Sequence, residues 1–206
     1  MTSDRASSPE PWETRRSETI VSDRWISVRA DDCVDARGRT IAPYYVLEYG
    51  DWVSVLAIDT AGDAVIVEEY RHGAGIVAWG TIGGGVAEGE DVAVAAAREL
   101  REETGYEAAS MIALGATWAN FGNHTNRVHH FVALGCQPTS EQSLDENEDI
   151  RVHVVPFEGL AEHLHQSYHQ LTWYKAEEFL RTTGPQATGR MRSVRSSSGS
   201  SVGSET

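Results

Sequence analysis

The amino-acid sequence predicts an α/β fold with a small N-terminal β domain. Short runs rich in β-branched and aromatic residues recur between residues 25 and 155, and two stretches dense in helix-forming residues lie among and after them. Hydrophobic residues make up 40% of the 206 residues and charged residues 23%, which suffices for a buried core and excludes a wholly disordered chain. The length suits one ordinary domain with tails rather than two full domains.

The first quarter of the chain divides into an arm and a β subdomain. Residues 1–19 are rich in Ser, Pro and charge, and we expect a flexible arm there. Residues 20–50 contain two β-type runs, residues 25–28 and 44–47, separated by the turn signal Asp35-Ala36-Arg37-Gly38. This pattern predicts a hairpin or small sheet. Because a small β layer alone is marginally stable, we expect it to pack on a second subunit in a homodimer.

Residues 51–182 form the predicted main domain. Strands are expected at residues 52–58 and 64–67 around a turn, and a glycine-rich loop follows over residues 73–89. The Ala- and Glu-rich segment 91–104 predicts a helix that ends at Gly105. Further strands are expected at residues 110–114, 127–134 and 151–155. Residues 157–182 are expected to form two helices broken near Gln170, and residues 183–206 a disordered, low-complexity tail.

Charge and cysteine content exclude several classes of function. The formal net charge is -14, and such a surface repels phosphate backbones, so we expect no nucleic-acid partner. No apolar run approaches the length needed to cross a bilayer, and the polar start lacks the apolar centre of a secretory signal. Cys33 and Cys136 form no CxxC pair, which gives no support to a disulfide framework or a structural zinc site. We expect a cytoplasmic protein with no membrane partner.

Three glutamates crowd the predicted helix over residues 91–104. At about 100° per residue, Glu99 and Glu103 lie one turn apart on the side that also carries Val92 and Ala96, which should face protein. Glu102 flanks that side. Crowded carboxylates raise one another's pKa, and a hard divalent cation such as Mg²⁺ relieves the repulsion. A charge-rich, solvated helix is the alternative interpretation, but the inward placement of Glu99 and Glu103 favours a metal site.

The spacing of these residues resembles the Nudix box, G-x5-E-x7-R-E-U-x-E-E-x-G-U, where U is a bulky apolar residue. The matching positions, with Tyr106 at the last U, are Gly84, Glu90, Arg98, Glu99, Leu100, Glu102, Glu103 and Gly105. The resemblance implies the Nudix α/β/α sandwich with a mixed β-sheet. It also implies hydrolysis of a nucleoside diphosphate linked to another moiety, with help from Mg²⁺ or alternatively Mn²⁺.

The resemblance also implies roles for individual residues of the box. Glu99 and Glu103 are the expected metal ligands, with Glu102 either a ligand or next to one, and the carbonyl of Gly83 completes the set. The residues expected to support the box, with Arg98 orienting a neighbouring carboxylate, are Gly84, Glu90 and Arg98.

A carboxylate should take the proton from the attacking water. The family often places this base, or a further metal-binding Glu, in a loop after the box. The acidic run over residues 144–149 is such a loop, and both Glu146 and Glu148 are candidates for that base. Glu102 is a candidate within the box itself. A plain solvated loop is the alternative interpretation of the acidic run.

Upstream of the box, residues 65–72 resemble the strand of ADP-ribose and nucleoside-diphosphate-sugar pyrophosphatases that ends in a Y/F-R pair. In those enzymes an Arg at the position of Arg71 binds phosphate, and aromatic residues of the N-terminal domain stack on the base. This implies substrate contacts for Arg71, Trp25 and Tyr44. The alternatives are a surface ion pair for Arg71 and a core or interface position for Trp25.

Two departures from that branch bear on the substrate. Gly80 and Ile82 stand where the branch has Glu and Pro, and Phe121 stands where the ADP-ribose enzymes have Pro. We expect these positions in substrate-facing loops, so the resemblance does not specify ADP-ribose itself. A Nudix-fold regulator that binds such a metabolite without turnover is the alternative function. Regulators of that kind often lose box glutamates, and none is lost here.

Overall fold

A computed structural model describes residues 8–183 of the chain. The chain divides into two compact units. The first takes in Met1–Asp51 and Trp118–Arg127, and the second takes in Trp52–Thr117 and Val128–Thr206. None of the helices within residues 8–183 is long and apolar enough to cross a membrane.

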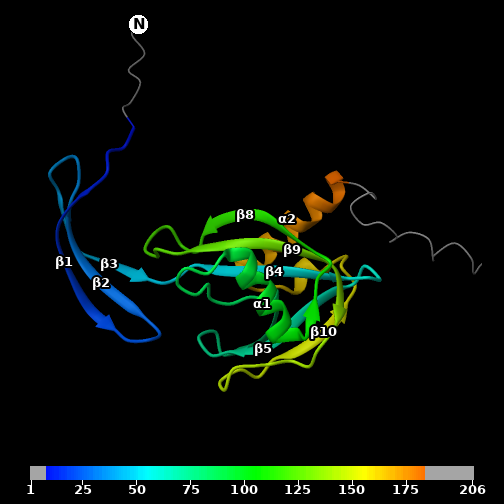
Figure 1. The fold of residues 1–206 in the computed structure, drawn as a ribbon. Helices are drawn as coiled ribbons and strands as arrows, with labels where there is room; N and C mark the ends of the chain where they lie inside the picture. Colours follow the sequence, from blue (N-terminus) through cyan, green and yellow to red (C-terminus); the bar gives the residue numbers. More distant parts are fainter. Residues whose placement is uncertain (1–7, 184–206) are drawn as a thin grey trace, which may run out of the picture. The chain divides into compact units, whose positions relative to one another are not determined.

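The first unit contains a three-stranded antiparallel sheet in the order β1-β2-β3, formed by β1 (Glu13–Ser22), β2 (Ser27–Val34) and β3 (Thr40–Glu48). The Asp35 carboxylate closes the turn between β2 and β3, because it accepts hydrogen bonds from the backbone N–H groups of Arg37 and Arg39 at 2.9 and 2.8 Å. The predicted hairpin is therefore confirmed (Figure 1).

The prediction of a flexible arm over residues 1–19 is wrong for residues 13–19. These residues form most of β1, which pairs with β2 along its length. Every residue of β1 is exposed, so the strand has no apolar face and is held by backbone pairing instead of burial. Residues 1–7, and the predicted tail from residue 184 onward, lie outside the described residues.

The second unit contains a seven-stranded sheet. Its main path runs β10-β5-β4-β9-β7, with β6 paired to β5 and β8 paired to β9. Strands β4 and β9 are parallel, whereas β5 is antiparallel to β4, β6 and β10, so the predicted mixed sheet is confirmed. The strands are β4 (Trp52–Asp59), β5 (Ala64–Arg71), β6 (Ile76–Gly80), β7 (Tyr106–Glu107), β8 (Ser110–Trp118), β9 (Arg127–Pro138) and β10 (Arg151–Val155).

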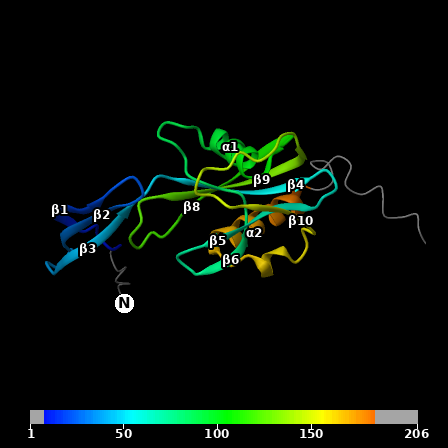
Figure 2. The ribbon, with the colours of Figure 1, turned by 90° about the horizontal axis from the view of Figure 1, so that it is seen from below.

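Helices cover both faces of this sheet. The alternation of side chains along β4 divides the core, since Val55 and Ala57 pack with Leu100 of α1 (Val92–Thr104). Leu56 packs on the other face with Trp173 of α2 (Ser167–Thr183) and with the 3₁₀ helix η1 (Leu160–His163). Figure 2 shows α1 and α2 on opposite sides of the strands. The predicted α/β/α sandwich is confirmed.

The first helix begins and ends where its sequence predicts. The Asp91 side chain accepts hydrogen bonds from the N–H groups of Ala93 and Val94, which have no partner within the helix. Gly105 ends the helix in the left-handed region, with φ of 73°, and donates its N–H to the Arg101 carbonyl. A side chain at Gly105 would also collide with the backbone carbonyl of Ser140, so both position and conformation require glycine.

Two predicted elements differ in the structure. The glycine-rich segment over residues 73–89 is not all loop, because β6 lies within it and pairs with β5. The C-terminal helical region is broken at residues 164–166, before Ser167, and α2 runs unbroken through Gln170. The Gln170 side-chain amide donates to the Leu164 carbonyl at 2.6 Å, which ties the start of α2 to the preceding break.

Candidate active site

The helix α1 points two glutamates into the protein. Glu99 and Glu103 are 9% and 5% exposed, whereas Glu102 is only partly buried. The prediction that Glu99 and Glu103 face inward is confirmed. Because α1 packs its Ala95, Ala96 and Leu100 side on the sheet, helical spacing brings both carboxylates to the sheet surface.

The two inward carboxylates meet the backbone of the glycine pair at positions 83 and 84. The N–H of Gly83 donates to Glu103 Oε2 at 3.2 Å. A side chain at Gly84 would collide with the Glu99 carboxylate, and one at Gly83 would collide with the Val53 carbonyl of β4. Val53 in turn donates its N–H to the Gly84 carbonyl at 3.0 Å. The absence of side chains therefore lets β4, the glycines and α1 converge on one point.

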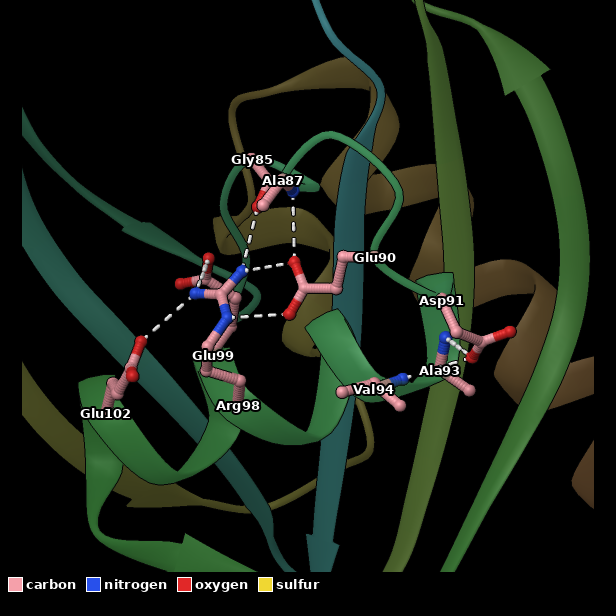
Figure 3. Close-up of polar contacts among 9 residues, drawn as sticks. All are labelled: Gly85, Ala87, Glu90, Asp91, Ala93, Val94, Arg98, Glu99 and Glu102. Carbon is pink, nitrogen blue, oxygen red and sulfur yellow. Dashed lines mark hydrogen bonds and ion pairs between the residues drawn. The ribbon is translucent and has the colours of Figure 1, made fainter.

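Arg98 joins three carboxylates of the box (Figure 3). Its guanidinium binds Glu90 through two parallel contacts, Nε to Oε1 at 2.9 Å and Nη2 to Oε2 at 3.0 Å. Nη1 donates to Glu99 Oε1 at 2.8 Å and to Glu102 Oε2 at 3.1 Å, and Nη2 also reaches the Gly85 carbonyl. These contacts lower the pKa of Glu90 to about 2 and raise that of Arg98 above its ordinary value. Arg98 thus fixes the positions of Glu99 and Glu102.

Glu103 has no arginine partner among the described residues, and its environment disfavours charge. Burial raises the pKa of Glu103 to about 9, and the negative charges of Glu99, Glu69 and Glu148 add to the shift. Burial also raises the pKa of Glu99, although Arg98 partly opposes this. In the absence of a cation, Glu103 therefore holds a proton at neutral pH.

The structure adds Glu69 of β5 to this cluster, a residue that the sequence reasoning missed. Glu69 shares the α1 face of the sheet with Val65 and Val67, because these positions alternate along the strand. Its carboxylate forms an ion pair with Arg71, and burial raises its pKa. The period-two alternation that runs into Glu69 was the signal that could have identified it.

The two candidate glutamates in the acidic loop after the box, Glu146 and Glu148, differ in their influence on the buried carboxylates. The charge of Glu148 acts on Glu69, Glu99 and Glu103, which places Glu148 at the edge of the cluster. Its backbone is fixed by a turn in which Glu148 Oε2 accepts the Asp145 N–H at 2.9 Å. Glu146 and Glu148 are both exposed, and the charge of Glu146 is not among the main causes of these pKa shifts.

The donor set suits a hard cation, although the side chains do not already surround one. Within residues 8–183, no three Asp, Glu, His or Cys side chains converge as a ready metal site. The physical reason is that Arg98 holds Glu99 and Glu102, while Glu103 is turned to the Gly83 N–H. Carboxylate oxygens are the ligands that Mg²⁺ prefers. Burial, with the neighbouring carboxylates, raises the pKa of Glu103, and a bound cation would favour its charged form.

The predicted substrate residues belong to different units. Arg71 lies at the end of β5 in the second unit, paired with Glu69. Trp25 and Tyr44 lie in the first unit. The Trp25 ring is exposed, with the guanidinium carbon of Arg24 4.3 Å from its centre. The Tyr44 hydroxyl donates to the Gly122 carbonyl, and its ring lies edge-on to Trp12 at 5.7 Å.

Two of the three branch departures do not lie in open loops as expected. Ile82 is fully buried in the core and accepts a backbone hydrogen bond from Val55 at 2.8 Å. Gly80 is also buried, and a side chain there would collide with the His169 ring. These two residues are therefore packing positions, since Gly80 pairs with Val67 of β5 and Ile82 pairs with Val55 of β4. Phe121, in contrast, is 86% exposed in a loop of the first unit.

Comparisons with known proteins agree with this geometry. A model of the NUDIX domain matches residues 48–179, and a model of the nucleoside diphosphate sugar hydrolase N-terminal domain matches residues 12–47. The methanol dehydrogenase activator of Bacillus methanolicus is 32% identical over 136 residues, which cover 66% of this chain and 73% of that protein. The ADP-ribose pyrophosphatase of Bacillus subtilis (strain 168) is 28% identical over 146 residues, covering 70% and 78%.

The fold is shared with a solved structure as well. An ADP compounds hydrolase matches with a TM-score of 0.77 at 22% sequence identity, covering 87% of this chain and 99% of that chain. The NUDIX model spans most of the chain and includes the whole box, the strand β5 and the acidic loop. The chain belongs to the Nudix family of hydrolases, with an N-terminal domain of the nucleoside diphosphate sugar hydrolase type.

Proposed function

We propose that this protein is a divalent-metal-dependent hydrolase that cleaves the diphosphate linkage of a nucleoside diphosphate joined to another moiety, of the ADP-ribose or nucleotide-sugar type. The observation that carries the proposal is the convergence of Glu99 and Glu103 on the Gly83–Gly84 backbone. That arrangement concentrates negative charge where a cation and a diphosphate can meet. The name of the Bacillus subtilis relative, an ADP-ribose pyrophosphatase, supports the substrate class.

Glu99, Glu103 and Glu102, with the Gly83 carbonyl, would hold the metal, which we take to be Mg²⁺ with Mn²⁺ as the alternative. When bound, the ion supplies charge neutralisation at the diphosphate and a water molecule of lowered pKa. Arg98 keeps Glu99 and Glu102 oriented through direct hydrogen bonds at 2.8 and 3.1 Å. The Arg71 guanidinium binds a phosphate oxygen, and its ion pair with Glu69 sets the direction in which it points.

For the general base we favour Glu148 over Glu146. The negative charge of Glu148 acts on Glu99 and Glu103, so its carboxylate lies within electrostatic reach of the metal-binding side chains. A base must come within hydrogen-bond reach of the attacking water, and small movements of a loop can complete such contacts when substrate binds. Glu102, which is held by Arg98, is the second candidate for this role.

We assign subunit assembly and base recognition to the first unit. It exposes several large apolar side chains, Trp12, Ile20, Val21, Trp25 and Tyr45, on a sheet of only three strands. A sheet of this size gains stability from a further packed surface, so we propose a homodimer, to be measured as the mass by light scattering. Stacking of Trp25 and Tyr44 on the base belongs to the same proposal. We also expect a cytoplasmic protein that binds neither nucleic acid nor membrane.

A second function is supported by one relative. The Bacillus methanolicus protein is named an activator of methanol dehydrogenase, so a regulator that binds a metabolite without turnover is the competing proposal. The intact set of box glutamates favours the hydrolase. The two functions differ in turnover, which a single assay measures.

The test is a hydrolysis assay with Mg²⁺ across ADP-ribose, sugar nucleotides, dinucleotides and nucleoside triphosphates. We expect cleavage of at least one compound of the type nucleoside diphosphate linked to a second group, with release of a nucleoside monophosphate. Glu88→Gln serves as the matched control, because Glu88 is an exposed glutamate of the same loop. Binding of these compounds without cleavage of any of them would support the regulator instead.

A further inference from the structure

The acidic loop over residues 145–149 is held by the core at both of its ends. Leu144 before the loop and Ile150 after it pack into the cluster that contains Leu100 of α1 and Val67 of β5. The residues between these two anchors are exposed. The loop therefore begins and ends on the face of the sheet that carries the box helix.

The middle of this loop makes no hydrogen bond to the box helix. Glu148 donates its N–H to the Asp145 carbonyl at 3.0 Å and accepts the Asp145 N–H through Oε2 at 2.9 Å, so the turn is closed on itself. Among the residues that the structure describes, no hydrogen bond or ion pair joins residues 145–149 to α1. The position of the loop relative to α1 is therefore set by the segments on either side of it.

The segment before the loop is attached to the C-terminal end of α1. The last carbonyls of a helix have no partner within the helix, and they need one from elsewhere. The Ser143 N–H donates to the Glu102 carbonyl at 2.9 Å, and the Thr139 N–H donates to the Gly105 carbonyl, also at 2.9 Å. The chain thus runs along the end of the box helix before it enters the acidic loop.

The side chain of Gln142 joins this helix end to the far end of the loop. Gln142 is exposed as a whole residue, but its Nε2 donates to the Glu103 carbonyl at 2.5 Å and to the Ile150 carbonyl at 3.3 Å. The amide nitrogen carries two hydrogens, so one side chain can serve both carbonyls. One carbonyl belongs to a proposed metal ligand, and the other belongs to the residue that follows the acidic loop.

The separation that Gln142 spans matters for general-base catalysis. A base acts only within hydrogen-bond reach of the water that it deprotonates. In the proposed function the metal-binding side chains come from α1, whereas the candidate bases Glu146 and Glu148 come from the loop. A misplacement of about 1 Å in such an arrangement costs on the order of 10²-fold in rate. The helix and the loop therefore need a fixed separation.

We propose that Gln142 is a positioning residue for hydrolysis: its amide holds the acidic loop at a set distance from the metal-binding end of α1, and so places the loop carboxylate that serves as base. This inference rests on the proposed function. It applies to either loop glutamate, because the amide acts on the end of the loop and not on one carboxylate. A simple cap on the end of α1 is the alternative role for this side chain.

The first test compares the hydrolysis kinetics of full-length wild type, Gln142→Met and Gln142→Asn at saturating Mg²⁺. Methionine has about the same volume but no donor, whereas asparagine keeps the amide on a side chain one carbon shorter. We expect kcat to fall about 10- to 100-fold in both variants, with KM and the apparent Mg²⁺ affinity within twofold of wild type. Gln137→Met, the same substitution at an exposed glutamine of β9, should match wild type.

A double-mutant cycle separates placement of the base from stabilisation of the helix. Gln142→Met is combined with whichever of Glu148→Gln and Glu146→Gln lowers kcat. If the amide acts through the base, Gln142→Met should lower kcat by less than twofold once that carboxylate is gone. A capping role would instead give losses that multiply, and this result would overturn the inference. It would also be overturned if neither loop substitution lowers kcat tenfold.

The order of the loop gives a measurement that needs neither metal nor turnover. Backbone ¹⁵N relaxation of metal-free protein should show lower order parameters for residues 145–149 in Gln142→Met than in wild type or Gln137→Met, with the β4 strand unchanged. The same spectra show whether each variant is folded. Unchanged order in the loop, a kcat within twofold of wild type in both Gln142 variants, or a loss confined to KM or to Mg²⁺ affinity would each overturn the inference.

This inference and the proposed function fail separately. A loop that loosens in Gln142→Met, in a protein that hydrolyses none of the compounds, would retain the tether and remove the hydrolase. Hydrolysis by wild type with an unchanged kcat in both Gln142 variants would retain the hydrolase and remove the positioning role.

Discussion

The backbone N–H of Gly83 donates to the carboxylate of Glu103, at 3.2 Å, across the space between the box loop and α1. Glu103 is almost fully buried, and this hydrogen bond only partly opposes the rise in its pKa to about 9. The contact defines the point at which the loop, the helix and β4 meet.

Gly84→Ala tests the close approach of the loop to α1. The added methyl group would occupy the position of the Glu99 carboxylate and displace it. We expect hydrolysis to fall at least tenfold, with a loss of stability of about 1–3 kcal/mol from local overpacking. Gly89→Ala, whose added carbon would meet open space, controls for substitution of a loop glycine, although its positive φ of 77° adds backbone strain of its own. Full activity in Gly84→Ala would show that Glu99 need not lie against the loop.

The raised pKa of Glu103 predicts how pH changes the stability of metal-free protein. With a pKa of about 9 in the folded state against an ordinary value of 4.5, the folded state binds more protons than the unfolded state between these values. Stability from this group is therefore fully present below about pH 4.5 and is lost as pH rises toward 9. The melting temperature in EDTA should fall over this range more steeply in wild type than in Glu103→Gln. Parallel profiles for the two proteins would refute the burial argument.

Arg98→Lys tests the role of the guanidinium fork. Lysine keeps the charge but cannot contact Glu90 through two parallel bonds while also holding Glu99 and Glu102. We expect the hydrolysis rate to fall about 10- to 100-fold, and NMR titration should show the pKa of Glu90 rising from about 2. Arg101→Lys, on the exposed side of the same helix, is the matched control. An Arg98→Lys rate within twofold of wild type would mean that charge alone suffices.

Glu148→Gln and Glu146→Gln form a matched pair within one loop. If Glu148 is the general base, its substitution should lower kcat by about 10²- to 10⁴-fold with little effect on KM or on Mg²⁺ affinity. Glu146→Gln should remain within a few-fold of wild type. If Glu148 binds metal instead, high Mg²⁺ should partly rescue the Glu148→Gln rate. If neither substitution slows the reaction tenfold, the base would have to be Glu102 or Glu99.

The parts of this protein that the sequence predicts well are those with a regular burial pattern. The 3.6-residue period places Glu99 and Glu103 inward, and the capping residues Asp91 and Gly105 delimit α1. Strand β1 escapes prediction because it is exposed on both faces, so no alternation marks it. The strand forms because its backbone pairs with β2, and amino-acid composition does not reveal that pairing.

The residues of the candidate site likewise divide into those that a regular sequence pattern predicts and those that it does not. The box residues are close in sequence and lie on one helix and its preceding loop, so their proximity is predictable from spacing. Glu69 reaches the cluster from β5, and only the register of the sheet brings it there. The choice between Glu146 and Glu148 depends on the path of an irregular loop, for which no periodic signal exists.

The most direct test of the metal assignment is the rate of diphosphate hydrolysis as a function of Mg²⁺ concentration in wild type, Glu103→Gln and Glu88→Gln. The account predicts no turnover in EDTA, recovery on adding Mg²⁺, and a Glu103→Gln rate lower by orders of magnitude with a weaker apparent affinity for Mg²⁺. Glu88→Gln, which removes the same charge from an exposed position, should match wild type. Unaltered turnover in excess EDTA, or a Glu103→Gln titration that coincides with that of wild type, would contradict the assignment of Glu103 as a metal ligand.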